Sequence, residues 1–120
     1  MKKWFDLIKA EFNVDINEEF VNKVRQEENL FEEDWGYLLG AIYKDIFNVK
    51  SFTIMSMYIK KEHRNLGNLK ILLDFADRRA KEEGCKYISL GQGLAFKEKR
   101  FYSVLKRLGY NKVEAVRKEL

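Results

Sequence analysis

The chain has 120 residues, of which 46% are hydrophobic and 35% are charged, with nine Phe, six Tyr and two Trp. This length and aromatic content exclude a disordered chain and a multidomain protein, so we expect one domain over residues 1–120. A single cysteine, Cys85, excludes an internal disulfide framework and predicts a reducing, cytoplasmic location. No apolar run reaches the roughly 18 residues of a membrane-spanning helix, so we expect no membrane partner.

Charge is distributed unevenly along the chain. The formal net charge is +4, yet residues 1–34 carry five Lys/Arg against ten Asp/Glu, and residues 35–120 carry eighteen against nine. A basic C-terminal part favours an anionic ligand, which charge alone leaves open among nucleic acid, an acidic protein and a phosphorylated cofactor.

Two helices are predicted within residues 1–34. The first covers residues 3–12, where one apolar stripe is formed by Trp4, Phe5, Ile8 and Phe12. Asp15 and Glu18 have the spacing of a capping box and predict the start of a second helix. Its expected inward-facing residues are Ile16, Phe20 and Val24.

The middle of the chain predicts two strands joined by a turn. Residues 36–44 are rich in Tyr, Leu and Ile, and residues 45–50 are expected to turn. Residues 52–59 are apolar on both faces apart from Thr53 and Ser56, a pattern typical of a central strand that is covered on both sides.

A helix with a clear inward stripe follows, formed by Leu69, Leu72, Leu73, Ala76 and Ala80. The pairs Asp74–Arg78 and Asp77–Lys81 are expected ion pairs on its outer face. Gly84 is expected to end this helix, and residues 86–91 predict another strand. A basic amphipathic helix is predicted over residues 96–108, while residues 111–120 fit either a strand or a helix.

Between the central strand and the clear helix lies a short basic turn that contains glycine. The unpaired N–H groups at a helix start suit a phosphate or pyrophosphate. Gly67 permits close approach of an anion to the backbone, and Arg64 offers charge-assisted hydrogen bonds. On these features alone, a simple connection between a strand and a helix is the competing interpretation.

Residues 59–90 resemble the central motif of the GNAT superfamily of N-acetyltransferases, in which a strand leads into Arg/Gln-x-x-Gly-x-Gly/Ala and then a helix. Arg64 and Gly67 match the first two fixed positions. Further matches are the apolar pair Leu72-Leu73 and the helix-end residues Ala80 and Gly84. The family's last motif is similar to Phe101-Tyr102 and Leu108-Gly109-Tyr110, so the resemblance covers residues 36–110.

This resemblance implies an α+β fold with a mixed, mostly antiparallel sheet that is splayed around a coenzyme A cleft and flanked by helices. Residues 36–110 would form the motif-bearing core and residues 1–34 the N-terminal helices. Acetyl-CoA is the implied co-substrate, with no metal. Pantetheine would bind the backbone of Met57 and Ile59. The residues implied at the pyrophosphate are Arg64, Asn65, Leu66, Gly67, Asn68, Leu69 and Lys70.

The implied chemistry is direct attack of an amine on the acetyl thioester, in which a tyrosine often protonates the leaving thiolate. The candidate here is Tyr102, one helical turn before Leu105, the position where the family usually has its tyrosine. Leu69 also replaces the family's Gly or Ala. These departures favour an alternative, a GNAT-like domain without activity that serves as a binding or structural component of a larger assembly.

Four further features have simpler interpretations. His63 is more simply a turn residue than a general base, and Cys85 a small buried apolar residue rather than a nucleophile. Gly91-Gln92-Gly93 favours a turn or bulge over a phosphate loop. Acidic residues interrupt the basic helix, which disfavours nucleic acid. The acceptor amine and any homo-oligomer remain open.

Overall fold

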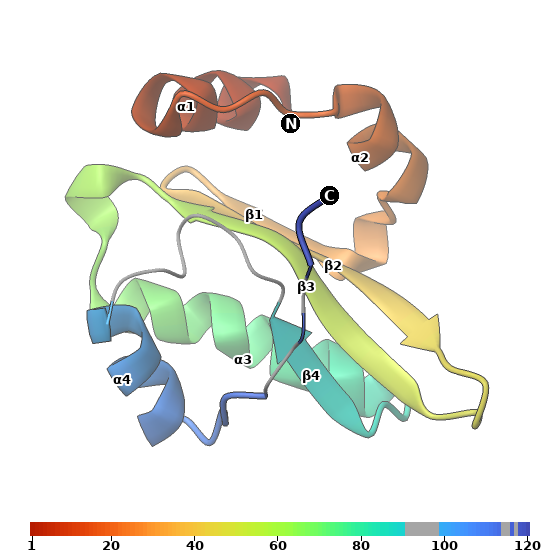
Figure 1. Ribbon diagram of the computed structural model, residues 1–120. Coiled ribbons are helices and arrows are strands. Elements are labelled where there is room, and N and C mark those ends of the chain that lie inside the picture. The colour runs from red at the N-terminus through yellow and green to blue at the C-terminus, as the bar shows by residue number, and fades with distance from the viewer. Residues whose placement is uncertain (91–98, 114–115, 117) are drawn as a thin grey trace.

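The computed structural model describes residues 1–90, 99–113, 116 and 118–120 (Figure 1). Its helices are α1 (Lys2–Phe12), α2 (Glu18–Val24), α3 (Leu66–Glu82) and α4 (Lys99–Arg107), with short 3₁₀ turns η1 (Glu27–Asn29) and η2 (Lys61–His63). Its strands are β1 (Leu30–Glu33), β2 (Gly36–Lys44), β3 (Lys50–Ile59) and β4 (Tyr87–Leu90).

The strands form one sheet in the order β1-β2-β3-β4. The β1–β2 and β2–β3 pairs are antiparallel, whereas β3 and β4 are parallel, so the sheet is mixed and mostly antiparallel, as expected. Helices α1 and α2 lie over one face, and α3 and α4 lie over the other (Figure 1). The predicted α+β class and the central position of β3 are therefore confirmed.

Two hydrophobic clusters hold these layers together, one on each face of the sheet. The larger cluster joins Leu38, Phe52 and Ile54 of the sheet to α3 and to Leu105 of α4. The smaller one joins Trp4 of α1 to the sheet residues Tyr37, Leu39 and Tyr58. Trp4 is fully buried, and its indole N–H donates to the Glu32 carboxylate. Burial of this one large side chain therefore fixes α1 to the sheet.

A β-bulge interrupts β3 in its middle. Leu39 pairs with Ser56 and Gly40 pairs with Ile54, so Met55 has no partner on β2. A Cβ at Gly40 would lie 2.1 Å from the ring of Phe52, which explains why glycine occupies this position. A bulge bends its strand and increases the local twist, so the second half of β3 leaves the direction of the first.

Helix α3 forms where the apolar period predicted it. Its buried residues are Leu69, Leu72, Leu73, Phe75, Ala76 and Ala80. Gly84 follows with φ 68°, the left-handed conformation expected of a residue that ends a helix. Asp77 pairs with Lys81 as predicted, but Arg78 pairs with Glu82 at 2.8 Å instead of Asp74. Asp74 and Glu82 each lie four residues from Arg78, so the sequence alone does not determine which of them pairs with it.

The prediction for residues 1–34 was wrong in three places. Helix α2 begins after Asn17, whose side chain accepts a hydrogen bond from the Phe20 N–H, so the N-cap is Asn17 and not Asp15. Phe20 is 47% exposed and does not face inward. Leu30–Glu33 forms β1 rather than helix, because it pairs with β2.

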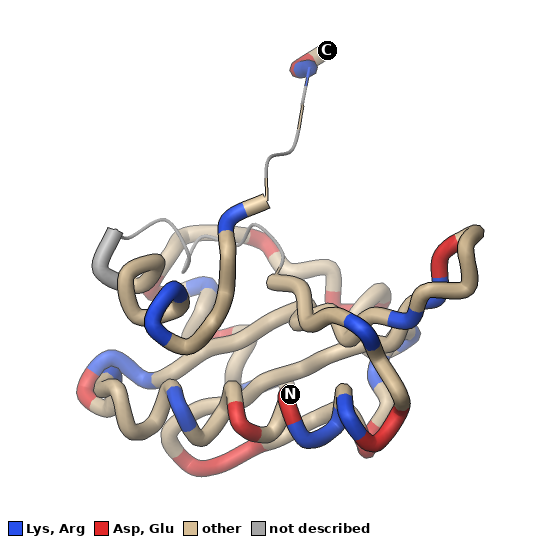
Figure 2. Tube along the Cα trace, turned by 90° about the horizontal axis from the view of Figure 1, so that it is seen from below, with Lys and Arg blue, Asp and Glu red and all other residues tan. Residues whose placement is uncertain are grey.

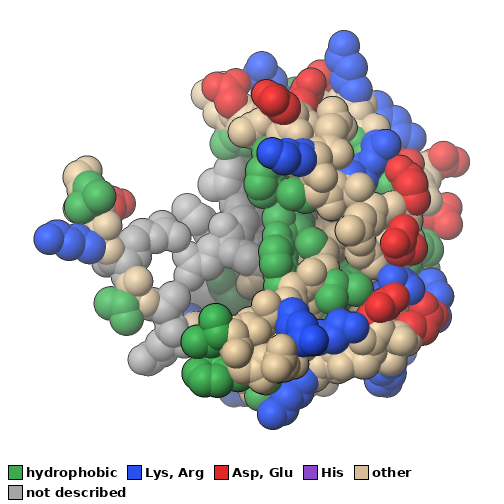
Figure 3. All heavy atoms as spheres, turned by 90° about the vertical axis from the view of Figure 1, so that its right-hand side faces the viewer, with side chains coloured by type: hydrophobic (Ala, Val, Ile, Leu, Met, Phe, Trp, Pro, Cys, Tyr) green, Lys and Arg blue, Asp and Glu red, His purple; other side chains and the backbone are tan. Residues whose placement is uncertain are grey.

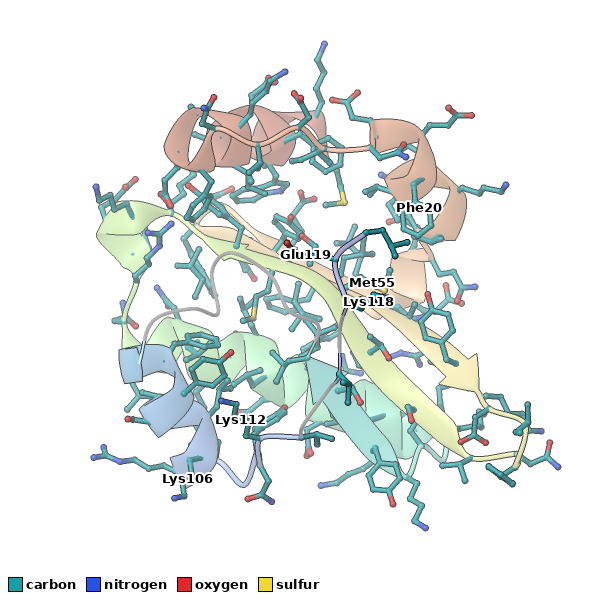
Figure 4. The ribbon with its side chains drawn as sticks, viewed as in Figure 1. Phe20, Met55, Lys106, Lys112, Lys118 and Glu119 are labelled. Atoms are coloured by element: carbon teal, nitrogen blue, oxygen red, sulfur yellow. The ribbon has the colours of Figure 1, made fainter. Side chains whose placement is uncertain are left out.

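Despite the uneven distribution along the sequence, Lys/Arg and Asp/Glu side chains lie near one another on the face drawn in Figure 3, and both kinds occur along the trace in Figure 2. Lys106 of α4 is exposed and lies on the face of the sheet opposite α1 (Figure 4). No helix in the described part of the chain is long and apolar enough to span a bilayer. The predicted start of the basic helix at residues 96–98 and the glycine pair at residues 91–93 lie outside the described residues.

Candidate coenzyme site

The end of β3 presents backbone groups to the side away from β2. The Lys60 N–H donates to the Trp35 carbonyl at 2.8 Å, which turns the backbone of Lys60 and Tyr58 toward β2. Because backbone groups alternate along a strand, Met57 and Ile59 point to the opposite edge. The described pairing of β4 with β3 ends at Ile54, before the bulge residue Met55 (Figure 4). The predicted pantetheine-binding backbone thus lies beyond this parallel pairing.

The turn from β3 to α3 is fixed by hydrogen bonds among its own residues. The His63 N–H donates to the Lys60 carbonyl at 2.8 Å, closing η2. The His63 carbonyl in turn accepts from the side-chain amides of Asn65 and Asn68. Asn65 is the N-cap of α3, and its side-chain oxygen accepts from the Asn68 N–H at 2.8 Å. Two asparagines therefore determine the direction in which α3 starts.

Two backbone N–H groups at the start of α3 remain available to a ligand. The Asn68 N–H is bound by the cap, and the Leu69 N–H donates to the Asn65 carbonyl at 3.1 Å. Within the described residues, the N–H groups of Leu66 and Gly67 make no hydrogen bond. A Cβ on Gly67 would lie 3.3 Å from the Asn65 side-chain oxygen, so glycine keeps this helix start open. The positive end of the α3 dipole adds attraction for an anion here.

Leu69 does not obstruct the helix start. Its side chain is 6% exposed and belongs to the cluster between α3 and the sheet. The family's small residue is thus replaced by a side chain that packs into the core, while its backbone stays in the first turn.

Arg64 connects the end of β3 to α1. Its Nε donates to the Ile59 carbonyl at 2.8 Å, and its Nη2 donates to both carboxylate oxygens of Glu11. The guanidinium also lies 5.4 Å from the centre of the Tyr58 ring. Sequence reasoning missed Glu11, because a contact across 53 residues has no local signal. As placed, Arg64 occupies the Ile59 carbonyl and holds the C-terminal end of α1.

An open groove of about 460 Å³ lies between α1 and the residues that follow β3. Its lining residues are Leu7, Ala10, Glu11, Tyr58, Lys60, Lys61 and Glu62. The Tyr58 hydroxyl donates to Glu11 at 3.3 Å. Burial, and then the negative charge of Glu11, raise the pKa of Tyr58, so its hydroxyl remains a donor at neutral pH.

On α4, Tyr102 and Leu105, which occupies the family's usual tyrosine position, differ in exposure. Leu105 is 5% exposed and packs in the larger cluster. Tyr102 is 44% exposed, so its hydroxyl is accessible to a ligand whereas the position of Leu105 is not. Tyr102 therefore stays the candidate proton donor, one turn from the position that the family motif indicates.

His63 and Cys85 have no chemical partner for their side chains among the described residues. His63 is exposed in η2, and only its backbone groups take part in hydrogen bonds within the described residues. Cys85 is half-buried and packs against the larger cluster. In the described part of the chain, no group of three or more His, Cys, Asp or Glu side chains could hold a metal ion.

A bulged strand with a parallel neighbour, leading through a short turn into a helix start with unbonded N–H groups, is an arrangement that suits an acyl-coenzyme A-binding transferase. The model of the acetyltransferase (GNAT) family matches residues 1–110, and the chain belongs to this family. Members of the family use acetyl-CoA and an amine substrate. No curated protein matches the sequence.

Solved structures share this fold at low sequence identity. A putative acetyl transferase from Pyrococcus furiosus superposes with a TM-score of 0.73 at 22% identity, covering 100% of this chain and 91% of the other. AAC(6')-Iy in complex with the bisubstrate analog CoA-S-monomethyl-acetylneamine gives 0.69 at 18% identity, covering 99% and 91%. Ribosomal-protein-alanine N-acetyltransferase from Brucella melitensis biovar Abortus 2308 gives 0.65 at 12% identity, covering 97% and 90%. At these identities the likeness establishes the fold alone.

Proposed function

We propose that this chain is an acetyl-CoA-dependent N-acetyltransferase that moves the acetyl group to an amine. The observation that carries the proposal is the start of α3, where Leu66 and Gly67 are exposed and their N–H groups make no hydrogen bond within the described residues, one short turn after a bulged central strand. Membership of the acetyltransferase family identifies acetyl-CoA as the ligand. The start of α3 fits this ligand, because N–H groups without hydrogen bonds at the positive end of a helix dipole bind a pyrophosphate well.

The residues of the chain have distinct roles in this proposal. The backbone of Met57 and Ile59 would hold the pantetheine arm along the side of β3 that points away from β2. The first turn of α3, from Leu66 to Lys70 after its cap Asn65, would bind the pyrophosphate. The Ile59 carbonyl accepts one hydrogen bond from Arg64 and has a second lone pair for the pantetheine arm.

Bound acetyl-CoA would supply an activated acyl carbon, which the amine attacks so that a C–N bond forms as the C–S bond breaks. The leaving sulfur takes a proton, and the exposed hydroxyl of Tyr102 is the proposed donor. The amine loses its proton to water. Structural neighbours include an aminoglycoside acetyltransferase and a ribosomal-protein-alanine N-acetyltransferase, so an aminoglycoside and a peptide N-terminus are the acceptors to test.

A second candidate is a GNAT domain that binds without catalysis. It is favoured by Leu105, which is buried where the family has its tyrosine. The replacement of the family's Gly or Ala by Leu69 does not support this alternative, because the Leu69 side chain packs in the core and leaves the helix start open.

Thermal unfolding with acetyl-CoA, desulfo-CoA and ATP tests whether the chain binds coenzyme A at the proposed site. Saturation at about 100 times the Kd stabilises the native state by about 2.7 kcal/mol, a shift on the order of ten degrees. We expect this shift with both coenzyme A compounds and not with ATP. Gly67→Ala should reduce it, because the new methyl group crowds the Asn65 side-chain oxygen at the helix start, whereas Lys81→Ala at the other end of α3 should keep it.

Release of free thiol in the presence of each acceptor then separates the two candidates. Thiol release that depends on the amine supports the enzyme. A coenzyme shift without thiol release for any amine would favour the binding domain, and the absence of any shift would overturn both.

A further inference from the structure

Glu11 is a carboxylate on the side of α1 that faces the sheet. It follows Trp4 by seven residues and Ile8 by three, so these side chains share one face of the helix, and the Glu11 side chain is only 20% exposed. It also belongs to the last turn of α1, where the negative end of the helix dipole disfavours a carboxylate. Neither its burial nor the dipole favours this charge, so its partners have to stabilise it.

Those partners are Arg64 and Tyr58. The Arg64 Nη2 donates to both carboxylate oxygens of Glu11, at 2.7 Å and 2.5 Å, and the Tyr58 hydroxyl donates at 3.3 Å. The same guanidinium lies 5.4 Å from the centre of the Tyr58 ring. Each of the three side chains thus contacts the other two, which joins the end of α1 to β3 and to the turn after it.

Arg64 extends this attachment to the backbone of the turn. Its Nε donates to the Ile59 carbonyl at 2.8 Å, so one side chain joins the last residue of β3 to the residue before the α3 cap Asn65. Residues 59–64 also separate the two parts of the proposed coenzyme site, the strand end and the start of α3. Because a guanidinium is planar and rigid, fixing its Nη2 on Glu11 also fixes its Nε on Ile59.

We propose that Glu11 is a positioning residue for acetyl-CoA binding, an inference that rests on the proposed function. By holding Arg64 on the Ile59 carbonyl, Glu11 keeps the strand end and the helix start in the arrangement that binds the coenzyme. Docking of α1 on the sheet and binding of the coenzyme are therefore coupled, and this coupling acts equally in both directions.

A competing role for Glu11 predicts an effect of the opposite sign. If Arg64 had to leave Glu11 in order to bind the coenzyme, removal of the carboxylate would tighten binding. The structure favours the positioning role, because Arg64 is held by three groups at once: the Glu11 carboxylate, the Ile59 carbonyl and the face of the Tyr58 ring.

Titration calorimetry of the full chain with acetyl-CoA tests the sign and the route of the effect. Glu11→Gln should weaken binding about fivefold, as expected when a partly exposed, charge-assisted pair loses one charge. In an Arg64→Gln background the same substitution should change the affinity by less than about twofold, because Glu11 acts through Arg64. Asp6→Asn, at an exposed carboxylate on the same helix, is the matched control and should leave the affinity unchanged.

Hydrogen exchange measures the reciprocal effect, which a purely structural contact would not produce. Saturation of the wild type with acetyl-CoA should increase the protection of the amides of residues 8–12 in α1, and Glu11→Gln should abolish this increase.

Three results would overturn the proposal while the proposed function stands. They are an affinity that Glu11→Gln leaves unchanged or raises, an equal loss in both backgrounds, and wild-type protection confined to β3 and α3. Absence of acetyl-CoA binding by the wild type overturns the proposed function as well. Circular dichroism melting identifies any variant that fails to fold, and the exchange measurement on the wild type then still decides.

Discussion

Helices α3 and α4 pack on the same face of the sheet but are built differently (Figure 1). Helix α3 has a side-chain cap at one end, a left-handed glycine after the other, and six buried residues. Among the described side chains of α4, one is buried, that of Leu105. In the proposed site, the coenzyme binds at the start of α3 and the proton donor lies on α4. The coenzyme part is therefore held by the more firmly packed of the two helices.

The comparison of α3 with α4 shows which features of a site tolerate substitution. The coenzyme half uses backbone N–H and carbonyl groups, which every residue supplies once the strand, bulge and cap are formed. Leu69 shows this, because a changed side chain turns into the core and leaves the backbone in place. The proton donor needs one particular side chain on one particular turn of a helix, and there this chain departs from its family.

Loss of the proposed proton donor should have the largest effect. Tyr102→Phe should lower kcat by about a hundredfold with KM unchanged, since general acid catalysis contributes on this order and the phenyl ring keeps the packing. Steady-state thiol release measures both constants. Tyr87→Phe, at an exposed tyrosine on β4, should change neither constant. An unchanged kcat in Tyr102→Phe would remove α4 from the chemistry.

Moving the tyrosine to the family's position should destabilise the protein. Leu105→Tyr should lower the free energy of unfolding by about 2 kcal/mol, because a larger, polar side chain enters a closed cluster. Urea unfolding measures this value. Wild-type stability in this variant would show that the cluster has room for a tyrosine and that the burial of Leu105 is not the obstacle.

The cap of α3 should matter less to stability. Asn65→Ala should cost about 1 kcal/mol, since it removes the acceptor of the Asn68 N–H. Asn22→Ala on the exposed side of α2 is the control and should cost nothing, because alanine is the better helix former. A loss at Asn65 no larger than that at Asn22 would contradict the importance assigned to this turn.

The smallest expected effect concerns the docking of the segment after α4 against α3. Burial, with Asp77 and Asp74 nearby, raises the pKa of Tyr110 to about 12. The folded state therefore retains this proton above pH 10, where the unfolded chain loses it. The resulting stability is fully present below pH 10 and is lost as pH rises to about 12.

Tyr37, whose pKa is also raised to about 12 by burial, titrates over the same range. Denaturant unfolding between pH 9 and 12 should accordingly show a shallower decline in Tyr110→Phe than in the wild type. Parallel declines would mean that Tyr110 is not held against the acidic residues of α3.

The sequence allowed prediction of the elements whose signal is local. The apolar period of α3, the two-sided apolar strand β3 and the glycine turn between them all follow from residues close in the chain. Strand β1 has only four residues, half of them glutamates, and becomes a strand because β2 pairs with it. The start of α2 was misplaced because Asp15 and Asn17 are both good caps and no proline distinguishes them.

Contacts within the candidate site divide in the same way. The open helix start at Gly67 was predictable from the motif, whereas the Glu11–Arg64 pair and the groove that it borders arise from the packing of α1 on the sheet. That packing depends on the burial of Trp4, whose neighbours lie far away in the chain. No spacing rule connects α1 to the turn after β3.

The most direct test of the coenzyme site is an amide NMR titration of the 15N-labelled chain with acetyl-CoA. The account predicts that the largest shift changes occur at the N–H groups of Leu66, Gly67, Met57 and Ile59, with small changes along the exposed face of α3 beyond its first turn. Saturable changes confined to other residues, or no change at any concentration, would contradict the claim that the bulged strand and the start of α3 form the coenzyme site.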